Sequence, residues 1–362
     1  MDSDPFVLTP HAKSFNSLFD EVIKTRRCMK CGACVASCPY KVLTIDNRAE
    51  LPILIGECVF CQICYYQCPR VDFQTQQIER LVFGKRLETK GRLGFYSSIY
   101  SARSKKKEIL ERCEDGGIVS SLAAYALDSG VADSAILACT HELLPWKAHP
   151  VIATSYEEVA ANAGSKYSIS PTILGLGKAV EDLKMKKVAL IGLPCQIQSL
   201  RRMQTTSLKA SNLADSVTLA ISLVCMESYA YDRFLYSLFA QKGIDPATVT
   251  KFSIKRGKFK IFVNNEEKLS LPLKEIKPLV NSGCTICSDY SGESADISVG
   301  AIGSPIGWST VFVRTDRGEE LLKGAVKAGF LEMKPLKEEG PEFELLLREA
   351  DRKKQRAAKN LA

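Results

Sequence analysis

The spacing of hydrophobic and polar residues changes character along the 362-residue chain. Up to about residue 80, apolar residues form only short runs, and those at 42–45 and 51–55 have the composition of short strands. From about residue 100, segments with helical periodicity alternate with short apolar runs. This alternation predicts an α/β domain of catalytic size after residue 100.

Particular segments carry the alternation. A helix is predicted at 118–127, which is apolar at helical spacing and stops at Gly130. A hairpin is predicted at 249–254 and 259–263 around Gly257, because both runs alternate. The remaining predicted strands are 135–139, 188–193, 217–225, 296–299 and 310–314, and the remaining helices are 178–184, 229–242, 317–327 and a basic amphipathic helix at 343–360.

The same changes in pattern predict where the chain divides. Its length is enough for about two to three domains. We expect a polar leader at 1–20, a cysteine-rich module at 21–80, a linker containing glycines at 81–100, a catalytic domain at 101–335 and a basic C-terminal helix at 336–362.

Charge and hydropathy argue against some classes of protein. The formal net charge is +8, but the basic residues are dispersed. This disfavours a nucleic-acid-binding protein, whose binding would depend strongly on salt. No run of about eighteen apolar residues is present, so no membrane span is predicted. Residues 1–20 contain Asp2 and Asp4 and no apolar core, unlike a secretory signal, so we expect a cytoplasmic protein with reduced cysteines.

Eight of the 14 cysteines fall into two copies of one motif. Each copy reads C-x2-C-x2-C-x3-C-P, the spacing of ferredoxins with two cubane clusters, in which the fourth cysteine ligates the other cluster. Zinc and disulfides are the alternatives, but zinc sites favour CxxC pairs over triplets followed by Cys-Pro. The motif predicts one [4Fe-4S] cluster on Cys28, Cys31, Cys34 and Cys68, and a second on Cys58, Cys61, Cys64 and Cys38.

Six cysteines remain outside these runs. Cys195 and Cys225 end predicted strands, and strand ends of an α/β sheet meet at one crevice, where the CxxC at 284–287 could join them. Four thiolates suffice for a third [4Fe-4S] cluster, but a zinc site, a redox dithiol and inert thiols fit the spacing too. Cys113 and Cys139 lack a partner pattern and are predicted to be free and buried.

Three short stretches could hold an organic cofactor. DGG at 115–117 precedes a predicted helix, where paired glycines let a phosphate approach the first amides, although a helix cap explains them equally. GSKY at 164–167 offers a hydroxyl, a cation and an aromatic ring, but is also an ordinary loop sequence. GAIGS at 300–304 resembles a phosphate loop without its third glycine. The absence of G-x-G-x-x-G and P-loop motifs disfavours NAD and nucleoside triphosphate sites. The three histidines, His11, His141 and His149, are predicted to form no cluster.

Several motifs, in order, resemble one family. They are EDGGIVSSLAAYALDSG at 114–130, GSKYSISP at 164–171, VALIGLPCQIQ at 188–198, ISLVCMES at 221–228 and the stretch 284–315. Together they are similar to the beta subunits of coenzyme F420-reducing hydrogenase and F420-linked formate dehydrogenase. With its two-cluster head, the chain looks closest to the electron-input subunit of F420H2 dehydrogenase, a complex-I-like membrane enzyme of methanogenic archaea.

The resemblance implies an α+β architecture, in which a ferredoxin-like 2[4Fe-4S] module precedes an α/β domain that binds a flavin and a [4Fe-4S] cluster. It implies FAD as the flavin and coenzyme F420 as the substrate. Ala301 departs from the polar residue that many relatives carry in its loop. By the resemblance, the third cluster's ligands are Cys195, Cys225, Cys284 and Cys287, and the FAD contacts are Gly116, Gly117, Ser165, Lys166 and Tyr167.

We therefore expect an F420H2 dehydrogenase. The resemblance implies that a hydride from reduced F420 reaches FAD without a catalytic side chain, and that single electrons then pass through three clusters. The acceptor would be ferredoxin or the peripheral arm of a membrane-bound F420H2 dehydrogenase complex. The alternatives are the reverse reaction with a hydrogenase or formate dehydrogenase, and a non-catalytic electron-transfer adaptor.

Overall fold

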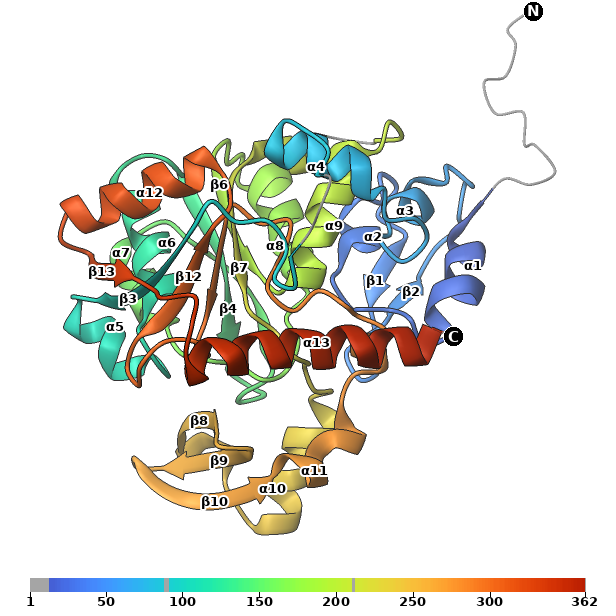
Figure 1. The fold of residues 1–362 in the computed structure, drawn as a ribbon. Helices are drawn as coiled ribbons and strands as arrows, with labels where there is room; N and C mark the ends of the chain where they lie inside the picture. The colour runs from blue at the N-terminus through green and yellow to red at the C-terminus, as the bar shows by residue number, and fades with distance from the viewer. Residues whose placement is uncertain (1–12, 88–90, 210–211, 362) are drawn as a thin grey trace, which may run out of the picture.

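A mixed sheet of eight strands forms the centre of the molecule (Figure 1). The computed structural model describes residues 13–87, 91–209 and 212–361, so most of the expected leader lies outside it. The sheet order is β13-β3-β12-β11-β7-β6-β4-β5, and neighbouring strands from β11 to β4 are parallel while the outer pairs are antiparallel. The strands are β3 (Ser98–Ser104), β4 (Ser134–Thr140), β5 (Ala148–Ala153), β6 (Val188–Gly192), β7 (Val217–Leu223), β11 (Ile297–Gly300), β12 (Ser309–Val313) and β13 (Leu331–Pro335).

Helices cover both faces of this sheet. β6 reads VALIG and all its residues are buried, as expected for a central parallel strand. One core joins α6 and α12 to the sheet through residues such as Leu122 and Leu321, and a second core holds α8 and α9 through Leu176 and Leu200. The helices of this domain are α5 (Lys107–Arg112), α6 (Ile118–Asp128), α7 (Tyr156–Ala161), α8 (Thr172–Gly177), η2 (Lys178–Asp182), α9 (Pro194–Thr205), η3 (Leu213–Ser216) and α12 (Asp316–Lys327).

The cysteine-rich head lies beside the sheet and packs against its helices. Ala33 and Ala36 of α2 share a hydrophobic core with Ile173 and Leu176 of α8. Phe15 and Leu18, at the end of the expected leader, are buried in the head's own core. The head contains α1 (Phe15–Leu18), η1 (Phe19–Ile23), α2 (Ala33–Ala36), the antiparallel pair β1 (Leu43–Ile45) and β2 (Pro52–Leu54), α3 (Ile63–Tyr66) and α4 (Thr75–Phe83).

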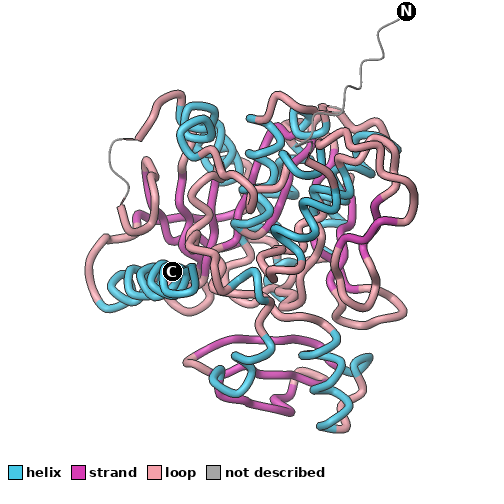
Figure 2. The backbone as a smooth tube through the Cα atoms, turned by 90° about the vertical axis from the view of Figure 1, so that its right-hand side faces the viewer, coloured by secondary structure: helices cyan, strands magenta, loops and turns pink. Residues whose placement is uncertain are grey.

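A small lobe projects below the rest of the molecule (Figure 2). The predicted hairpin around Gly257 is present, but a third strand, β10, which the sequence did not reveal, joins it in the order β10-β9-β8. Phe234, Phe252 and Phe259 form its aromatic core. The lobe contains η4 (Asp232–Tyr236), α10 (Ser237–Lys242), η5 (Pro246–Thr248), β8 (Val249–Lys255), β9 (Lys258–Val263), β10 (Glu266–Pro272), α11 (Leu273–Ile276), η6 (Lys277–Leu279) and η7 (Ser282–Cys284).

The chain ends in one long helix, α13 (Pro341–Leu361), which runs beneath the sheet toward the head (Figure 1). It confirms the amphipathic helix predicted at 343–360. The α+β fold class is confirmed, and all the strands that were predicted are present. The structure adds β3, β5 and β13, which lie at or near the sheet edges, and starts the helix predicted at 178–184 earlier, at Thr172. No helix in the described part of the chain is long and apolar enough to cross a membrane.

Candidate functional site: three cysteine groups and a loop pair

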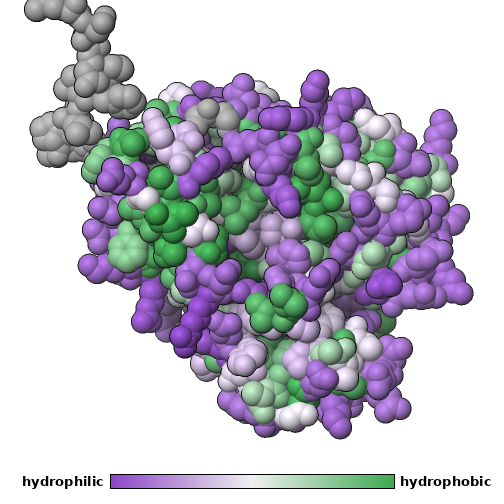
Figure 3. Space-filling model, turned by 180° about the vertical axis from the view of Figure 1, so that it is seen from behind, coloured by the Kyte–Doolittle hydropathy of each residue, from purple (hydrophilic) through white to green (hydrophobic). Residues whose placement is uncertain are grey.

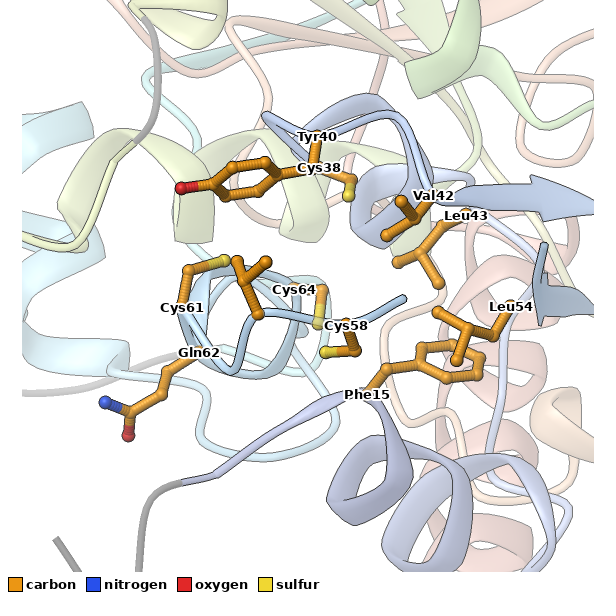
Figure 4. A pocket seen from close by; sticks show the side chains of 11 residues that line it. Phe15, Cys38, Tyr40, Val42, Leu43, Leu54, Cys58, Cys61, Gln62 and Cys64 are labelled. Atoms are coloured by element: carbon orange, nitrogen blue, oxygen red, sulfur yellow. The ribbon is translucent and has the colours of Figure 1, made fainter. Parts of the chain in front are cut away.

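One group of cysteines lines a cavity in the head (Figure 4). Cys38 comes from the first motif run, whereas Cys58, Cys61 and Cys64 come from the second. The cavity therefore combines cysteines of both runs. Burial raises the pKa of the Cys64 thiol to about 12, and Cys61, Cys58 and Cys38 contribute to that rise. We call these four residues the outer group. The cavity is otherwise lined by Phe15, Tyr40, Val42, Leu43, Leu54, Val59 and Gln62.

The remaining four cysteines of the motif runs also converge. Burial raises the pKa of Cys28 to about 11 and that of Cys68 to about 12, and the thiol of Cys31 adds to both effects. The pKa of Cys34 is raised as well, by burial and then by Cys31, Cys28 and Cys68. We call Cys28, Cys31, Cys34 and Cys68 the middle group. The structure thus brings together the two sets that the motif spacing paired.

Buried cations surround the middle group. Arg202 is only 2% exposed, and burial lowers its pKa while Asp72 and Cys68 oppose that effect. Arg70 is close enough to Cys28 to lower the pKa of that thiol. Guanidinium nitrogens of both arginines are buried without a hydrogen-bond partner in the described residues. Orphaned buried donors are rare in proteins, so this environment fits an anionic cluster held by four thiolates.

A third group forms where strand ends meet a turn. Cys195 is the second residue of α9, after Pro194, and Cys225 follows the end of β7. Cys284 and Cys287 lie on the turn at η7. Burial raises the pKa of Cys195 well above its usual range, and Cys287, Cys284 and Cys225 raise it further. We call these four residues the inner group.

Each of the three groups offers four thiols. No three His, Cys, Asp or Glu side chains in the described residues lie close enough to hold a single metal ion. A four-iron cubane separates its ligands by the width of a cluster, unlike the tetrahedral shell of one zinc ion. Four thiols are the ligand set that such a cluster takes.

The three groups are neighbours in a fixed order. The charge of Cys31 in the middle group raises the pKa of Cys195 in the inner group. The charge of Cys64 in the outer group likewise raises the pKa of Cys34 in the middle group. A Cβ added to Gly283, beside Cys284, would lie 2.3 Å from the carbonyl oxygen of Cys28, so the inner and middle segments touch. The order is therefore inner, middle, outer.

The loop at 164–167 contacts residues 112 and 114, just before the loop at 115–117 that leads into α6. Gly117 is the N-cap of α6 with a φ of 69°, in the left-handed region that favours glycine. Gly116 donates its amide to Oγ of Ser309, and a Cβ there would lie 2.6 Å from the carbonyl oxygen of Ala102. Packing alone therefore requires both glycines.

Residues of the second loop are already partnered. The hydroxyl of Tyr167 donates to the carboxylate of Glu114 at 2.8 Å, and its ring packs edge-on against Phe259. Nζ of Lys166 donates to the carbonyl oxygens of Asn162 and Ala163. Burial lowers the pKa of Lys166 to about 8. Ser165 is half-buried on the same loop.

Further residues at this loop pair escaped the sequence analysis. Nζ of Lys251 donates to the carbonyl of Cys113, and Lys255 forms an ion pair of 3.1 Å with Asp115. Both lysines lie on β8, far from the loops in sequence, where a half-buried strand lysine gave no sign of a role. By contrast Ala301, which departs from the family pattern, is exposed.

The histidines and the two cysteines without a partner pattern also have neighbours in the structure. The histidines were predicted to form no cluster, and no ligand group of three or more side chains is found among the described residues. Two of them nevertheless form a pair that the sequence did not reveal, because β4 pairs with β5 and brings the rings of His141 and His149 to 5.3 Å. Sγ of Cys139 lies 3.0 Å from Nε2 of His149. Cys113 is half-buried and donates to the carbonyl of Asp115 at 2.8 Å. His11 lies outside the described residues.

Three family models match successive parts of the chain. A 4Fe-4S dicluster domain matches residues 27–71. The N-terminal part of the coenzyme F420 hydrogenase/dehydrogenase beta subunit matches residues 99–176, and its C-terminal part matches residues 185–339.

Individual relatives agree with these matches. The beta subunit of coenzyme F420 hydrogenase in Methanothermobacter thermautotrophicus is 40% identical over 75% of this chain and 95% of its own length. A chain of the F420-reducing [NiFe] hydrogenase complex from Methanosarcina barkeri is 35% identical, with a TM-score of 0.71, over 76% of this chain and 94% of that chain. A subunit of the F420H2 dehydrogenase of Methanosarcina mazei is 30% identical over 83% of this chain and 82% of its own length.

These values correct the expectation that the chain is closest to the electron-input subunit of F420H2 dehydrogenase, since the hydrogenase beta subunit shares more identity. The chain belongs to the coenzyme F420 hydrogenase/dehydrogenase family of beta subunits, which are parts of F420-dependent oxidoreductases, and carries an N-terminal 4Fe-4S dicluster domain.

Proposed function

We propose that the chain oxidises reduced coenzyme F420 and delivers single electrons to a protein acceptor, ferredoxin or the peripheral arm of a membrane-bound F420H2 dehydrogenase complex. The observation that carries the proposal is the order of the cysteine groups. It leads from the α/β domain, through the middle group, to a cavity in the head. An adaptor without catalysis would need no inner group beside the domain that the family models match.

Three [4Fe-4S] clusters and FAD are the cofactors that we propose. Cys195, Cys225, Cys284 and Cys287 would hold the third cluster, and the loop pair around Gly116, Gly117, Ser165, Lys166 and Tyr167 would hold the flavin. When bound, FAD exchanges a hydride for single electrons, and the clusters carry those electrons.

The chain's own residues do the positioning. The thiols would hold the clusters, and Arg70 and Arg202 beside the middle group would offset its negative charge. At the loop pair, Lys251 and Lys255 bring positive charge to the residues just before an 11-residue helix, whose N-terminus favours phosphate oxygens, and Lys166 adds a cation on the second loop. No acid or base is needed for hydride transfer, so positioning is the contribution of the protein.

The reverse reaction is the second candidate. The higher sequence identity to the beta subunit of an F420 hydrogenase favours this direction. In that case the same groups would carry electrons inward from a hydrogenase or formate dehydrogenase to F420.

Anaerobically purified chain tests the proposal. We expect about twelve irons, by the composition of three cubanes, and one FAD for each chain, together with bleaching of the clusters on addition of F420H2 alone. Preference for NADH over F420H2 would contradict the substrate. Absence of flavin would favour the adaptor. Transfer to ferredoxin, compared with reduction of F420 by reduced ferredoxin, distinguishes the two directions.

A further inference from the structure

Helix α13 buries one lysine in an otherwise apolar stripe. The residues of α13 that are buried recur at helical spacing and are Phe343, Leu346, Ala350, Lys353 and Ala357. Lys353 is only 2% exposed. Burying an ammonium group is costly unless it finds partners, so this position needs an explanation that the amphipathic pattern does not supply. The family model ends at residue 339, before this helix begins.

The partners of Lys353 and of its neighbours on α13 lie on the inner group. Nζ of Lys353 donates to the carbonyl oxygen of Cys225 at 2.5 Å. Arg356 donates to the carbonyl oxygens of Met226 at 2.9 Å and Cys284 at 3.1 Å. One turn later, Asn360 donates to the carbonyl oxygen of Thr285 at 3.1 Å. Residues at this spacing share one helix face, so α13 caps two segments that carry three of the four inner cysteines.

Lys353 and Arg356 differ in how their charge is offset. Arg356 forms an ion pair with Glu227. In the described part of the chain, the polar partner given to the ammonium of Lys353 is the neutral carbonyl of Cys225. Burial acts to lower the pKa of Lys353, but Cys225, Cys287, Asp289 and Cys284 together raise it above its usual value. The charge of Lys353 therefore faces three of the inner cysteines and the carboxylate of Asp289. In a buried setting with a low effective dielectric constant, such a charge acts strongly over several ångströms.

We propose that Lys353 is an electrostatic positioning residue of the inner group, and that its charge raises the reduction potential of the cluster held there. The inference rests on the third cluster of the proposed function. Reduction adds negative charge to a site already carrying four thiolates, and a buried cation stabilises the reduced form more than the oxidised form. Net charge and hydrogen bonds near the ligands are known determinants of such potentials.

Potentiometric titration of the full cluster-loaded chain, followed by EPR, tests this role. The inner signal is identified as the one that Cys287→Ser removes. Lys353→Met removes the charge at similar length, Lys353→Arg keeps it, and Lys359→Met makes the same change in net charge at an exposed position of the same helix. We expect Lys353→Met to lower the ratio of reduced to oxidised inner cluster about tenfold at the wild-type midpoint, equivalent to about 59 mV for one electron.

The controls separate the possible results. Lys353→Arg and Lys359→Met should keep the wild-type midpoint, and the signals of the head should not move in any variant. If Lys353→Met shows the same potential as Lys359→Met, the proposal is wrong. If Lys353→Met loses iron, Lys353→Gln is titrated instead, because it keeps a donor for the Cys225 carbonyl without the charge. Iron loss in that variant too would assign Lys353 a structural role and overturn the proposal.

Failure of the third cluster itself would look different. Wild-type chain would then contain about eight irons, by the composition of two cubanes, and Cys287→Ser would remove no signal. About twelve irons with an unmoved potential would instead overturn the role of Lys353 alone.

Discussion

The outer and inner cysteine groups each offer four thiols, but their surroundings differ. The outer group lies in a cavity lined by apolar residues, and its neighbours Tyr40, Val59 and Phe60 are 51%, 40% and 43% exposed. Figure 3 shows hydrophobic residues gathered on the side of the molecule that carries the head. The inner group lies against α13, which brings Lys353 and Arg356 to the segments that carry its cysteines.

This difference suggests a division of labour between the two ends. A group near the surface with an apolar rim suits contact with another redox protein, because apolar patches mark interaction sites. A group that lies against α13 and is bordered by its cations suits a cofactor whose reduction potential must stay constant. The predictions below test this contrast.

Removing one ligand from either end should remove one cluster. We expect Cys287→Ser and Cys58→Ser each to lose about a third of the iron, that is about four of about twelve irons, by the composition of the clusters. Each variant should lose a different EPR signal, measured together with iron content by colorimetry. A variant with full iron and all signals would remove its cysteine from the proposed ligands, and zinc in place of iron would contradict both ends at once.

The loop pair at the inner end should depend on Lys166. If its ammonium attracts an anionic pyrophosphate, Lys166→Met should weaken FAD retention about ten- to a hundredfold, the effect of losing about 1.5–3 kcal/mol of charge-assisted hydrogen bonding. Iron content should stay unchanged, because no proposed ligand is altered. Flavin occupancy measured by fluorescence after denaturation, beside iron content, provides the test, with Lys166→Arg as the matched control that keeps the charge.

The pH dependence of flavin retention gives a second readout. Burial lowers the pKa of Lys166 to about 8, so the ammonium loses its proton as the pH rises through that value. Retention in the wild type should therefore fall above about pH 8, whereas Lys166→Met should show no such step. A step of the same size in both proteins would mean that another group is responsible.

The apolar rim of the outer group should matter only for protein acceptors. Phe60→Glu introduces a charge at a 43% exposed position. We expect it to slow electron transfer to ferredoxin about tenfold, the effect of a single contact worth about 1.4 kcal/mol. Reduction of a small dye should stay at the wild-type rate. Ile306→Glu, at an 82% exposed position of another segment, is the control. Equal slowing in both variants would argue against a docking face on the head.

The contact between the inner and middle segments should be sensitive to Gly283. Alanine there would place its Cβ 2.3 Å from the Cys28 carbonyl oxygen. We expect Gly283→Ala to cost about 1–3 kcal/mol of unfolding free energy, the usual effect of overpacking, measured by urea denaturation. Gly91→Ala, whose nearest neighbour would be 3.8 Å away, is the control. An unchanged midpoint would show that the segments can separate without loss.

The sequence predicts a feature of the fold or of the site best where the residues that form it lie close together in the chain. The motif spacing of the head predicted which cysteines share a group, and the structure places them so, because short turns leave three thiols little freedom. Apolar runs such as VALIGL predicted β6, because a central parallel strand is buried on both faces. The edge strands β5 and β13 carry partly polar patterns and gave no comparable signal.

The inner group shows the limit of this reasoning. Its cysteines come from segments separated by up to 92 positions, from Cys195 to Cys287, so spacing left zinc, a dithiol and inert thiols open and only the family resemblance favoured a cluster. The helical period predicted that the C-terminal segment is amphipathic, but the burial of Lys353 in its apolar stripe is seen only in the structure. Only the tertiary structure decided what faces that stripe, because packing a helix against distant segments is a property of the folded chain and not of its local pattern.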